Sequence, residues 1–194
     1  MTIIRDGAGA GNQARVNSEK QLFVRAFQIP RLSAKSDSGD AYITYGKHQL
    51  VAGSTNEALF LFQNTATSVH VHIEQIMFST NSTAMKIELF VNMARTSGGT
   101  LRVPNNSNRT SGKTSQVLMY DNDPDDLVLT GNTAATEILD LRLAAAGTSS
   151  LVVPFDGGII LGPQDTLGAV VEGATIGDKV RASIYFYEEN AEDI

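Results

Sequence analysis

The chain has 194 residues and a formal net charge of −6, with 42% hydrophobic and 19% charged residues. This composition fits a globular protein with one ordinary domain and an appendage, and it excludes a disordered polyelectrolyte. Cysteine is absent, which excludes disulfides, thiol catalysis and thiolate zinc sites, and no apolar run reaches the roughly 18 to 20 residues that span a bilayer.

Charge is divided unevenly along the chain. Residues 1–35 hold six basic and two acidic residues, a net charge of +4, whereas the remainder holds nine basic and nineteen acidic residues, a net charge of −10. This asymmetry predicts that the first segment contacts an acidic surface, either nucleic acid, another protein or a second copy of this chain. The alternative is that so small a sample is uneven by chance.

The first 40 residues differ in character from the rest. They begin with glycines at positions 7, 9 and 11, and only residues 22–29 have strand character. Residues 33–40, SAKSDSGD, indicate a loop or hinge. The sequence therefore predicts an extended N-terminal arm over residues 1–40 and a body over residues 41–194. No apolar stretch typical of a signal peptide opens the chain, so we expect no export by that route.

From Tyr42 onward the main pattern is an alternation with a period of two, which is typical of half-buried strands. The apolar phase of residues 69–78 changes midway, which predicts a β-bulge near Glu74 or Gln75. Residues 134–146 fit a helix or a strand, and the surrounding strands favour a strand. The expected strands cover residues 58–62, 69–78, 85–93, 117–120, 127–130, 151–155, 158–161, 166–172 and 180–187.

Turn residues separate these strands, with reversals expected at residues 156–158, 162–165 and 177–178. Eight or more short strands with such turns predict an all-β fold, an antiparallel β-sandwich of jelly-roll type. A long polar segment, residues 94–116, contains four basic residues and no acidic residue. Long loops of this kind are commonly functional or mobile.

The search for catalytic and ligand-binding motifs gives little. Residues 9–14 fit the glycine pattern of dinucleotide sites, but they lack the strand before and the helix after that such a site requires. The four carboxylates within residues 121–126 suit either a calcium site or a turn. His70 and His72 could form half of a metal site, but no third ligand is identifiable. We therefore expect a protein that is not an enzyme and holds no cofactor and no metal.

Two stretches resemble a known group of proteins. One is the N-terminal run with DGAGAG at residues 6–11, ARVN at 14–17 and QLFVR at 21–25, and the other is LGPQDTL at 161–167 with the last strand, 180–188. In these stretches, about a quarter of the chain, the sequence resembles tailed-bacteriophage capsid decoration and auxiliary head (head-fibre-like) structural proteins. Residues 94–116 have no counterpart in that resemblance.

The resemblance implies a virion structural protein on the outer capsid surface that binds the major capsid protein, stabilises or decorates the shell and forms a homo-oligomer, often a trimer. Neither nucleic acid nor a membrane is an expected partner. On charge, the expected capsid contacts are Arg5, Arg15, Arg25 and Arg31. Because residues 58–62 are apolar on both faces and the last strand has two tyrosines on its second face, the expected subunit interface comprises Phe60, Phe62, Tyr185 and Tyr187.

Two other functions remain open. One is a phage fibre, tail or baseplate component that binds a host-surface glycan, in which the loops matter more than the arm. The other is a hydrolase that acts on envelope polysaccharide with paired carboxylates from separate strands.

Overall fold

The structure is a computed structural model. It describes residues 4–5, 13–16, 22–23, 31–51, 56–82, 84–124, 126–130, 136–144, 149–173 and 175–190. The chain forms two compact units, Met1–Pro30 and Arg31–Ile194. In the first unit, strands β1 (Ile4–Arg5), β2 (Gln13–Val16) and β3 (Leu22–Phe23) form an antiparallel sheet in the order β1-β2-β3.

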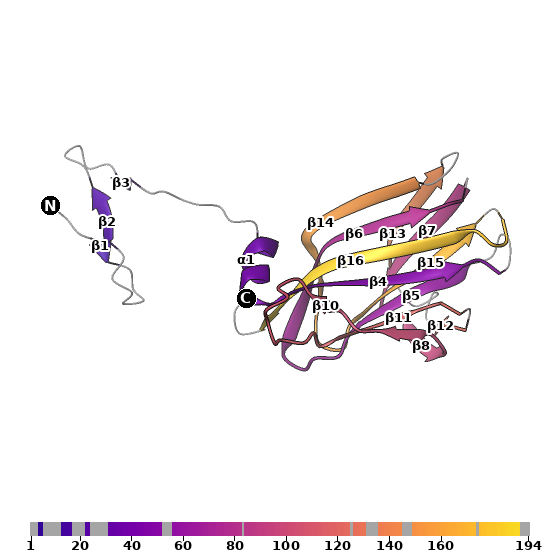
Figure 1. Ribbon diagram of the computed structural model, residues 1–194, viewed down its shortest axis with the longest axis horizontal. Helices are drawn as coiled ribbons and strands as arrows, with labels where there is room; N and C mark the ends of the chain where they lie inside the picture. The colour runs from indigo at the N-terminus through magenta and orange to yellow at the C-terminus, as the bar shows by residue number, and fades with distance from the viewer. Residues whose placement is uncertain are drawn as a thin grey trace. The chain divides into compact units, whose positions relative to one another are not determined.

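The second unit contains two large antiparallel sheets and one short helix (Figure 1). The five-stranded sheet has the order β10-β4-β16-β6-β14, and the six-stranded sheet has the order β13-β7-β15-β5-β11-β9. Strands β8 and β12 form a separate pair. The elements are α1 (Arg31–Ser38), β4 (Ala41–Gln49), β5 (Glu57–Asn64), β6 (Val69–Thr80), β7 (Ala84–Val91), β8 (Ala94–Ser97), β9 (Thr100–Arg102), β10 (Asn105–Asn106), β11 (Val117–Asp121), β12 (Val128–Thr130), β13 (Thr136–Ala144), β14 (Ser149–Leu161), β15 (Thr166–Gly173) and β16 (Lys179–Asn190).

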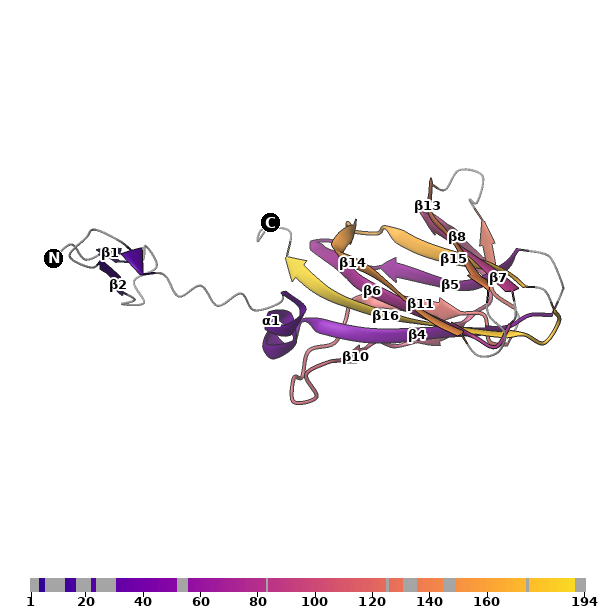
Figure 2. The ribbon, with the colours of Figure 1, turned by 90° about the horizontal axis from the view of Figure 1, so that it is seen from above.

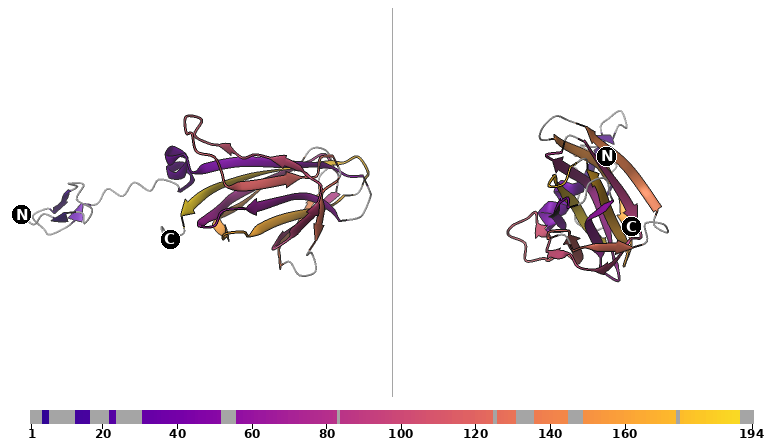
Figure 3. Two further views of the ribbon diagram at one scale, coloured as in Figure 1. Left: turned by 90° about the horizontal axis from the view of Figure 1, so that it is seen from below. Right: turned by 90° about the vertical axis from the view of Figure 1, so that its right-hand side faces the viewer.

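The two sheets form the layers of a sandwich, with the hydrophobic core between them (Figure 3). Alternate residues of β4 and β16 point into the core, which is the reason for the period of two in the sequence. Phe186 of β16 stacks on Tyr42 of β4 with the ring centroids 5.6 Å apart, and it meets Phe62 of β5 across the core at 5.0 Å. The all-β prediction is therefore confirmed.

Two local predictions are confirmed by the pairing of strands. Opposite β16, Tyr185 pairs with Gln75 and Phe186 pairs with Ile73, so Glu74 is the extra residue of a β-bulge in β6. Residues 136–144 form strand β13 along β7. The alternating leucines, of which Leu139 and Leu141 pack against the core, outweigh the helix preference of the alanines.

Residues 33–40 are not the expected loop, because Arg31–Ser38 form helix α1. The helix ends in a Schellman motif, in which the amide of Asp40 donates to the carbonyl of Lys35 and that of Gly39 donates to Ser36. Gly39 has a φ of +79°, a conformation that glycine adopts without strain. The residues that suggest a loop therefore form most of a helix and its C-terminal cap.

Residues 156–158 do not reverse the chain. Residues on both sides, 149–154 and 159–161, pair with the same strand, β6, so β14 is one strand with an irregularity between Pro154 and Ile159. The other two expected turns are present, with positive φ angles at Gln164 and Gly177.

The polar segment 94–116 contains three short strands, β8, β9 and β10. Its part around β10 lies beside α1 at one end of the body, whereas β8 lies toward the other end (Figure 2). Helix α1 has eight residues. Within the described part of the chain no helix is long and apolar enough to cross a membrane.

Candidate functional site

The expected capsid contacts fall into both units. Arg5 lies in β1 and Arg15 in β2 of the first unit, whereas Arg31 is the first residue of α1 in the second. Arg25 lies outside the described residues. The boundary between the units is at Pro30, because α1 packs against β4 and β16.

Three of the four expected interface residues lie in the interior of the body. Phe60 and Phe62 are 0% exposed in the core, so the chain's own sheets cover both residues. Tyr187 is also 0% exposed, because α1 packs on its strand, with Lys35 Nζ 5.8 Å from the ring centroid, and His72 stacks on the ring at 4.6 Å. These three side chains are thus unavailable at the surface, which corrects the expectation. Tyr185 is half-buried.

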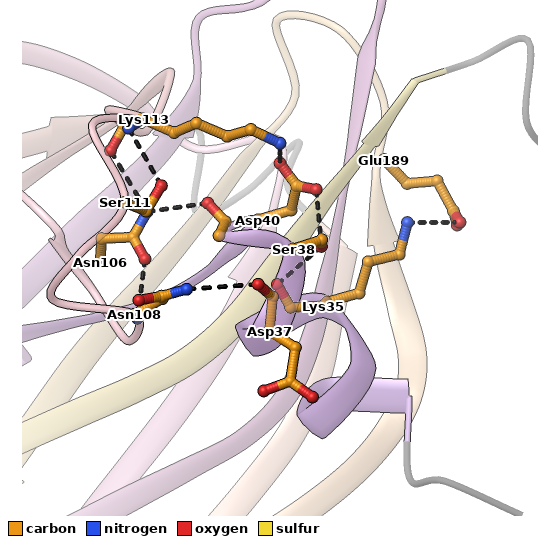
Figure 4. A network of polar contacts seen from close by, with 10 residues as sticks. Lys35, Asp37, Ser38, Asp40, Asn106, Asn108, Ser111, Lys113 and Glu189 are labelled. Carbon is orange, nitrogen blue, oxygen red and sulfur yellow. Dashed lines mark hydrogen bonds and ion pairs between the residues drawn. The ribbon is translucent and has the colours of Figure 1, made fainter.

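A polar network joins α1 to the segment 94–116 and to the end of β16 (Figure 4). Lys35 pairs with Glu189 at 2.9 Å, and Lys113 pairs with Asp40 at 2.7 Å. Ser38 donates to the second oxygen of Asp40 at 2.8 Å. Asn106 Nδ2 donates to the carbonyl of Gly39 at 2.8 Å. The network therefore fixes the helix C-terminus on the body.

The same region contains two carboxyls with opposite pKa shifts. Burial raises the pKa of Glu188, although hydrogen bonds from Ser115 Oγ at 2.5 Å and from the amide of Gln116 at 2.9 Å act to lower it. Burial also acts to raise the pKa of Asp40, but hydrogen bonds from Lys113 and Ser38 outweigh it and lower the pKa. Burial, with the charge of Glu188, raises the pKa of Tyr42 to about 12.

These groups line an open pocket of about 450 Å³. Carboxyls with opposed shifts are what an acid and base pair requires. Here, however, both oxygens of Asp40 accept bonds from its own chain, and Glu188 holds Ser115 and Gln116 in place. Hydrogen bonds account for the lowered pKa of Asp40 and burial accounts for the raised pKa of Glu188. Both shifts therefore follow from the attachment of α1 and of the polar segment to the body.

Three of the four basic side chains of the segment 94–116, those of Arg95, Arg102 and Lys113, have partners in the body. Arg102 pairs with Asp121 at 2.9 Å, and Arg95 lies over the ring of Tyr120 at 4.0 Å. Burial raises the pKa of Asp121, and the hydrogen bond from Arg102 opposes that shift. Asp123 pairs with Lys47 and lies 3.7 Å from Arg102. Two of the four carboxylates that suggested calcium are thus paired with cations, while Asp125 lies outside the described residues.

The histidines do not form a metal centre in the described residues. His48 donates from Nδ1 to the carbonyl of Asn122 at 2.9 Å and contacts Glu57 through Nε2 at 2.5 Å. His72 lies 3.4 Å from Glu189. One group of three possible ligands occurs in the described ranges: Glu88, Glu137 and Asp140. Lys86 pairs with Glu88 at 2.7 Å and lies 3.8 Å from Asp140. The ammonium group of Lys86 therefore already neutralises part of the negative charge of this cluster.

The outer face of the five-stranded sheet is a further candidate surface. A row across four strands places Tyr45 beside Ser183, Ser183 beside Met77, and Met77 beside Val152. Tyr45 is 40% exposed and Val152 is 49% exposed. Guanidinium groups lie near the Tyr45 ring, that of Arg102 at 5.5 Å and that of Arg181 at 6.0 Å from its centroid.

Sequence reasoning did not identify Tyr45. The alternation of buried and exposed residues in 41–49 was a usable signal, because it puts Ile43, Tyr45 and Lys47 on one face. The cations around Tyr45 come from positions far apart in the chain, and only strand pairing brings them together. Searches of protein-family models, of curated proteins and of solved structures found no match to this chain.

Proposed function

We propose that the second unit is a sandwich of the jelly-roll type. Its eight long strands lie in the orders β4-β16-β6-β14 and β13-β7-β15-β5. Along the chain, each of these strands is followed by one in the other sheet, except at the step from β7 to β13. This alternation supports two interlocked Greek keys, an arrangement common in viral capsid and lectin domains.

The chain's function, in this proposal, is structural: it is a non-enzymatic component of a tailed-bacteriophage virion. It binds the major capsid protein on the outside of the shell. Its body forms a homo-oligomer, and the sequence resemblance implies that this oligomer is a trimer. The first unit acts as an extended arm that carries the capsid contacts Arg5, Arg15 and Arg25. Neither a cofactor nor a nucleic acid takes part.

The observation that carries this proposal is the opposite charge of the two units. Residues 1–30 hold four basic and two acidic residues, whereas residues 31–194 hold eleven basic and nineteen acidic residues. Like-charged bodies on a crowded shell repel one another, and a basic segment on each copy supplies attraction to an acidic neighbour. The internal pairing of Asp40, Glu188 and Asp121 supports a structural role over a catalytic one.

The test mixes the full chain with purified capsid shells that lack this chain. Reversing Arg5, Arg15 and Arg25 to glutamate removes the basic character of the first unit, and we expect co-sedimentation with the shells to be lost. Reversing Arg142, an exposed residue of β13, changes charge on the body and is the control. Undiminished binding of the triple variant would overturn the role of the arm.

A second candidate function has one specific observation in its favour. A fibre, tail or baseplate component that binds a host-surface glycan needs an exposed aromatic ring beside hydrogen-bonding groups, and Tyr45 provides such a ring on the outer face of the five-stranded sheet. Binding of any glycan by the chain would support this candidate, provided that Tyr45→Ala removes it.

A further inference from the structure

The surface around Tyr45 is a pocket as well as an exposed ring. It has a volume of about 410 Å³ and lies over β4 and β16 beside β10. The residues that give it polar and charged groups, besides the Tyr45 hydroxyl, are Lys47, Asn105, Arg181 and Ser183. The pocket therefore combines one aromatic face with amide, hydroxyl and cationic donors.

A second pocket continues from the first. It has a volume of about 360 Å³, shares Lys47 and Arg181 with the first, and extends to Lys179 and Asn81 at the ends of β16 and β6. The two pockets adjoin at these two shared residues, and we call them together the Tyr45 trough. Two adjoining pockets suit a chain-like ligand, whereas a single small ion would occupy only one of them.

The charge of the trough is opposite to that of the body. Lys47, Lys179 and Arg181 line it, with Asp123 as the carboxylate among the lining residues. Asp123 is already paired with Lys47. No carboxylate of the described residues lies within 4.0 Å of Lys179 or Arg181. In a unit that holds nineteen acidic and eleven basic residues, such an uncompensated pair of cations points to an anionic ligand.

The kind of anion follows from the other groups in the trough. The apolar C–H face of a pyranose ring stacks on a tyrosine, and amide and hydroxyl groups bind its hydroxyls. Arg181 matches a carboxylate with two parallel hydrogen bonds. Single-stranded nucleic acid sites stack successive bases on several aromatic rings. Among the residues that line the two pockets, Tyr45 is the one exposed aromatic side chain, since His48 is only 2% exposed.

We propose that the Tyr45 trough binds an acidic oligosaccharide, with a sugar ring on Tyr45 and a carboxylate on Arg181 and Lys179. This inference rests on the second candidate function, glycan binding, and names its ligand class and site. It does not depend on the attachment of the chain to a capsid through the arm.

The experiment measures binding of tetragalacturonate to the full chain by calorimetry and by saturation-transfer NMR. Its fully methyl-esterified form is the neutral counterpart, and an oligothymidylate of similar charge is the nucleic acid probe. We expect the acid form to bind at least ten-fold more tightly than the ester, with binding that weakens as salt is raised.

Variants localise the binding. Tyr45→Leu keeps an apolar side chain on the exposed face, and we expect it to abolish the saturation-transfer signal. Arg181→Gln is expected to weaken binding of the acid form at least ten-fold while leaving any binding of the ester unchanged. Arg142→Gln, on β13 of the other sheet, is the matched control and is expected to bind as the wild type does.

The outcomes are distinguishable. Equal affinity for acid and ester, lost in Tyr45→Leu, would overturn the acidic ligand but leave glycan binding intact. Tight binding of oligothymidylate without binding of either saccharide would overturn the inference in favour of nucleic acid. Binding that persists in both variants would place the ligand elsewhere and overturn the site, and no binding of any probe would overturn the inference outright.

Discussion

Phe62 and Phe186 meet edge to face across the core, with their ring centroids 5.0 Å apart and their planes at 86°. Phe62 belongs to the six-stranded sheet and Phe186 to the five-stranded sheet, so this contact joins the two layers. Both side chains are 0% exposed. Edge-to-face pairs add to the free energy gained by burial of the rings.

We expect Phe62→Ala to lower the free energy of unfolding by about 3 to 5 kcal/mol, because it leaves a cavity between the two sheets. Val152→Ala, at a position 49% exposed on β14, is expected to change it by less than about 0.5 kcal/mol. Chemical denaturation of the full chain measures both. A small effect of Phe62→Ala would mean that the sheets do not share the tightly packed core described above.

The C-terminal cap of α1 gives a second prediction. A Cβ atom at Gly39 would clash with Ser111 Oγ, and the φ of +79° disfavours a residue with a side chain. We expect Gly39→Ala to cost at least about 1 to 2 kcal/mol of stability and to speed hydrogen exchange in α1. Gly112→Ala is the control, since no atom lies within 4 Å of its added Cβ. Equal exchange rates in the two variants would argue against the packing of α1 on the polar segment.

Glu188 predicts a specific dependence of stability on pH. Burial raises its folded pKa above the ordinary value of 4.5. The folded state therefore binds more protons than the unfolded state just above pH 4.5, and stability falls as the pH rises through that window. Glu188→Gln keeps an oxygen acceptor for Ser115 and Gln116 but does not titrate. We expect this variant to lose less stability than the wild type between pH 4.5 and neutrality.

The Asp40 carboxyl changes stability with pH in the opposite direction to Glu188 and in a lower pH range. Its folded pKa is lowered from 3.8, so the stability that the Asp40 carboxylate contributes is present above pH 3.8 and is lost as the pH falls through the folded pKa.

Parallel stability curves for the wild type and Glu188→Gln above pH 4.5 would contradict the burial of the Glu188 carboxyl.

Asn64 gives a prediction for a buried polar side chain. It is 0% exposed, and its Nδ2 lies within hydrogen-bond distance of the carbonyls of Val69 at 2.8 Å and Gly162 at 2.9 Å. Asn64→Ala leaves these carbonyls without that donor, so we expect a loss of about 1 to 3 kcal/mol. Asn105→Ala, at an exposed position, is expected to be nearly neutral. A neutral Asn64→Ala would mean that other groups satisfy these carbonyls.

The sequence predicted the fold class and one detail of strand geometry, because both depend on local patterns. A change of apolar phase in residues 69–78 is visible in a single strand, and it located the bulge that the structure has at Glu74. Sequence patterns missed α1 and predicted a loop at residues 33–40. A helix cap and a loop use the same small polar residues, and only tertiary contacts such as Lys35 with Glu189 decide between them.

Site residues were harder to predict because burial is a property of the whole molecule. Tyr187 follows the alternation of Tyr185 and therefore looked exposed, but α1 covers its end of the sheet. The Tyr45 trough depends on Lys179 and Arg181, which lie far from Tyr45 in the sequence. The spacing of residues in a single sequence does not predict contacts between strands that are distant in the chain.

The most direct test of the structural role is the amount of this polypeptide in purified phage particles. Particles from a lysate are separated on a density gradient, and the polypeptide is quantified against the major capsid protein by mass spectrometry. The proposal predicts a high copy number in a simple ratio to the capsid protein. A few copies per particle would favour the fibre or tail component instead, and complete absence from the particles would contradict the virion role.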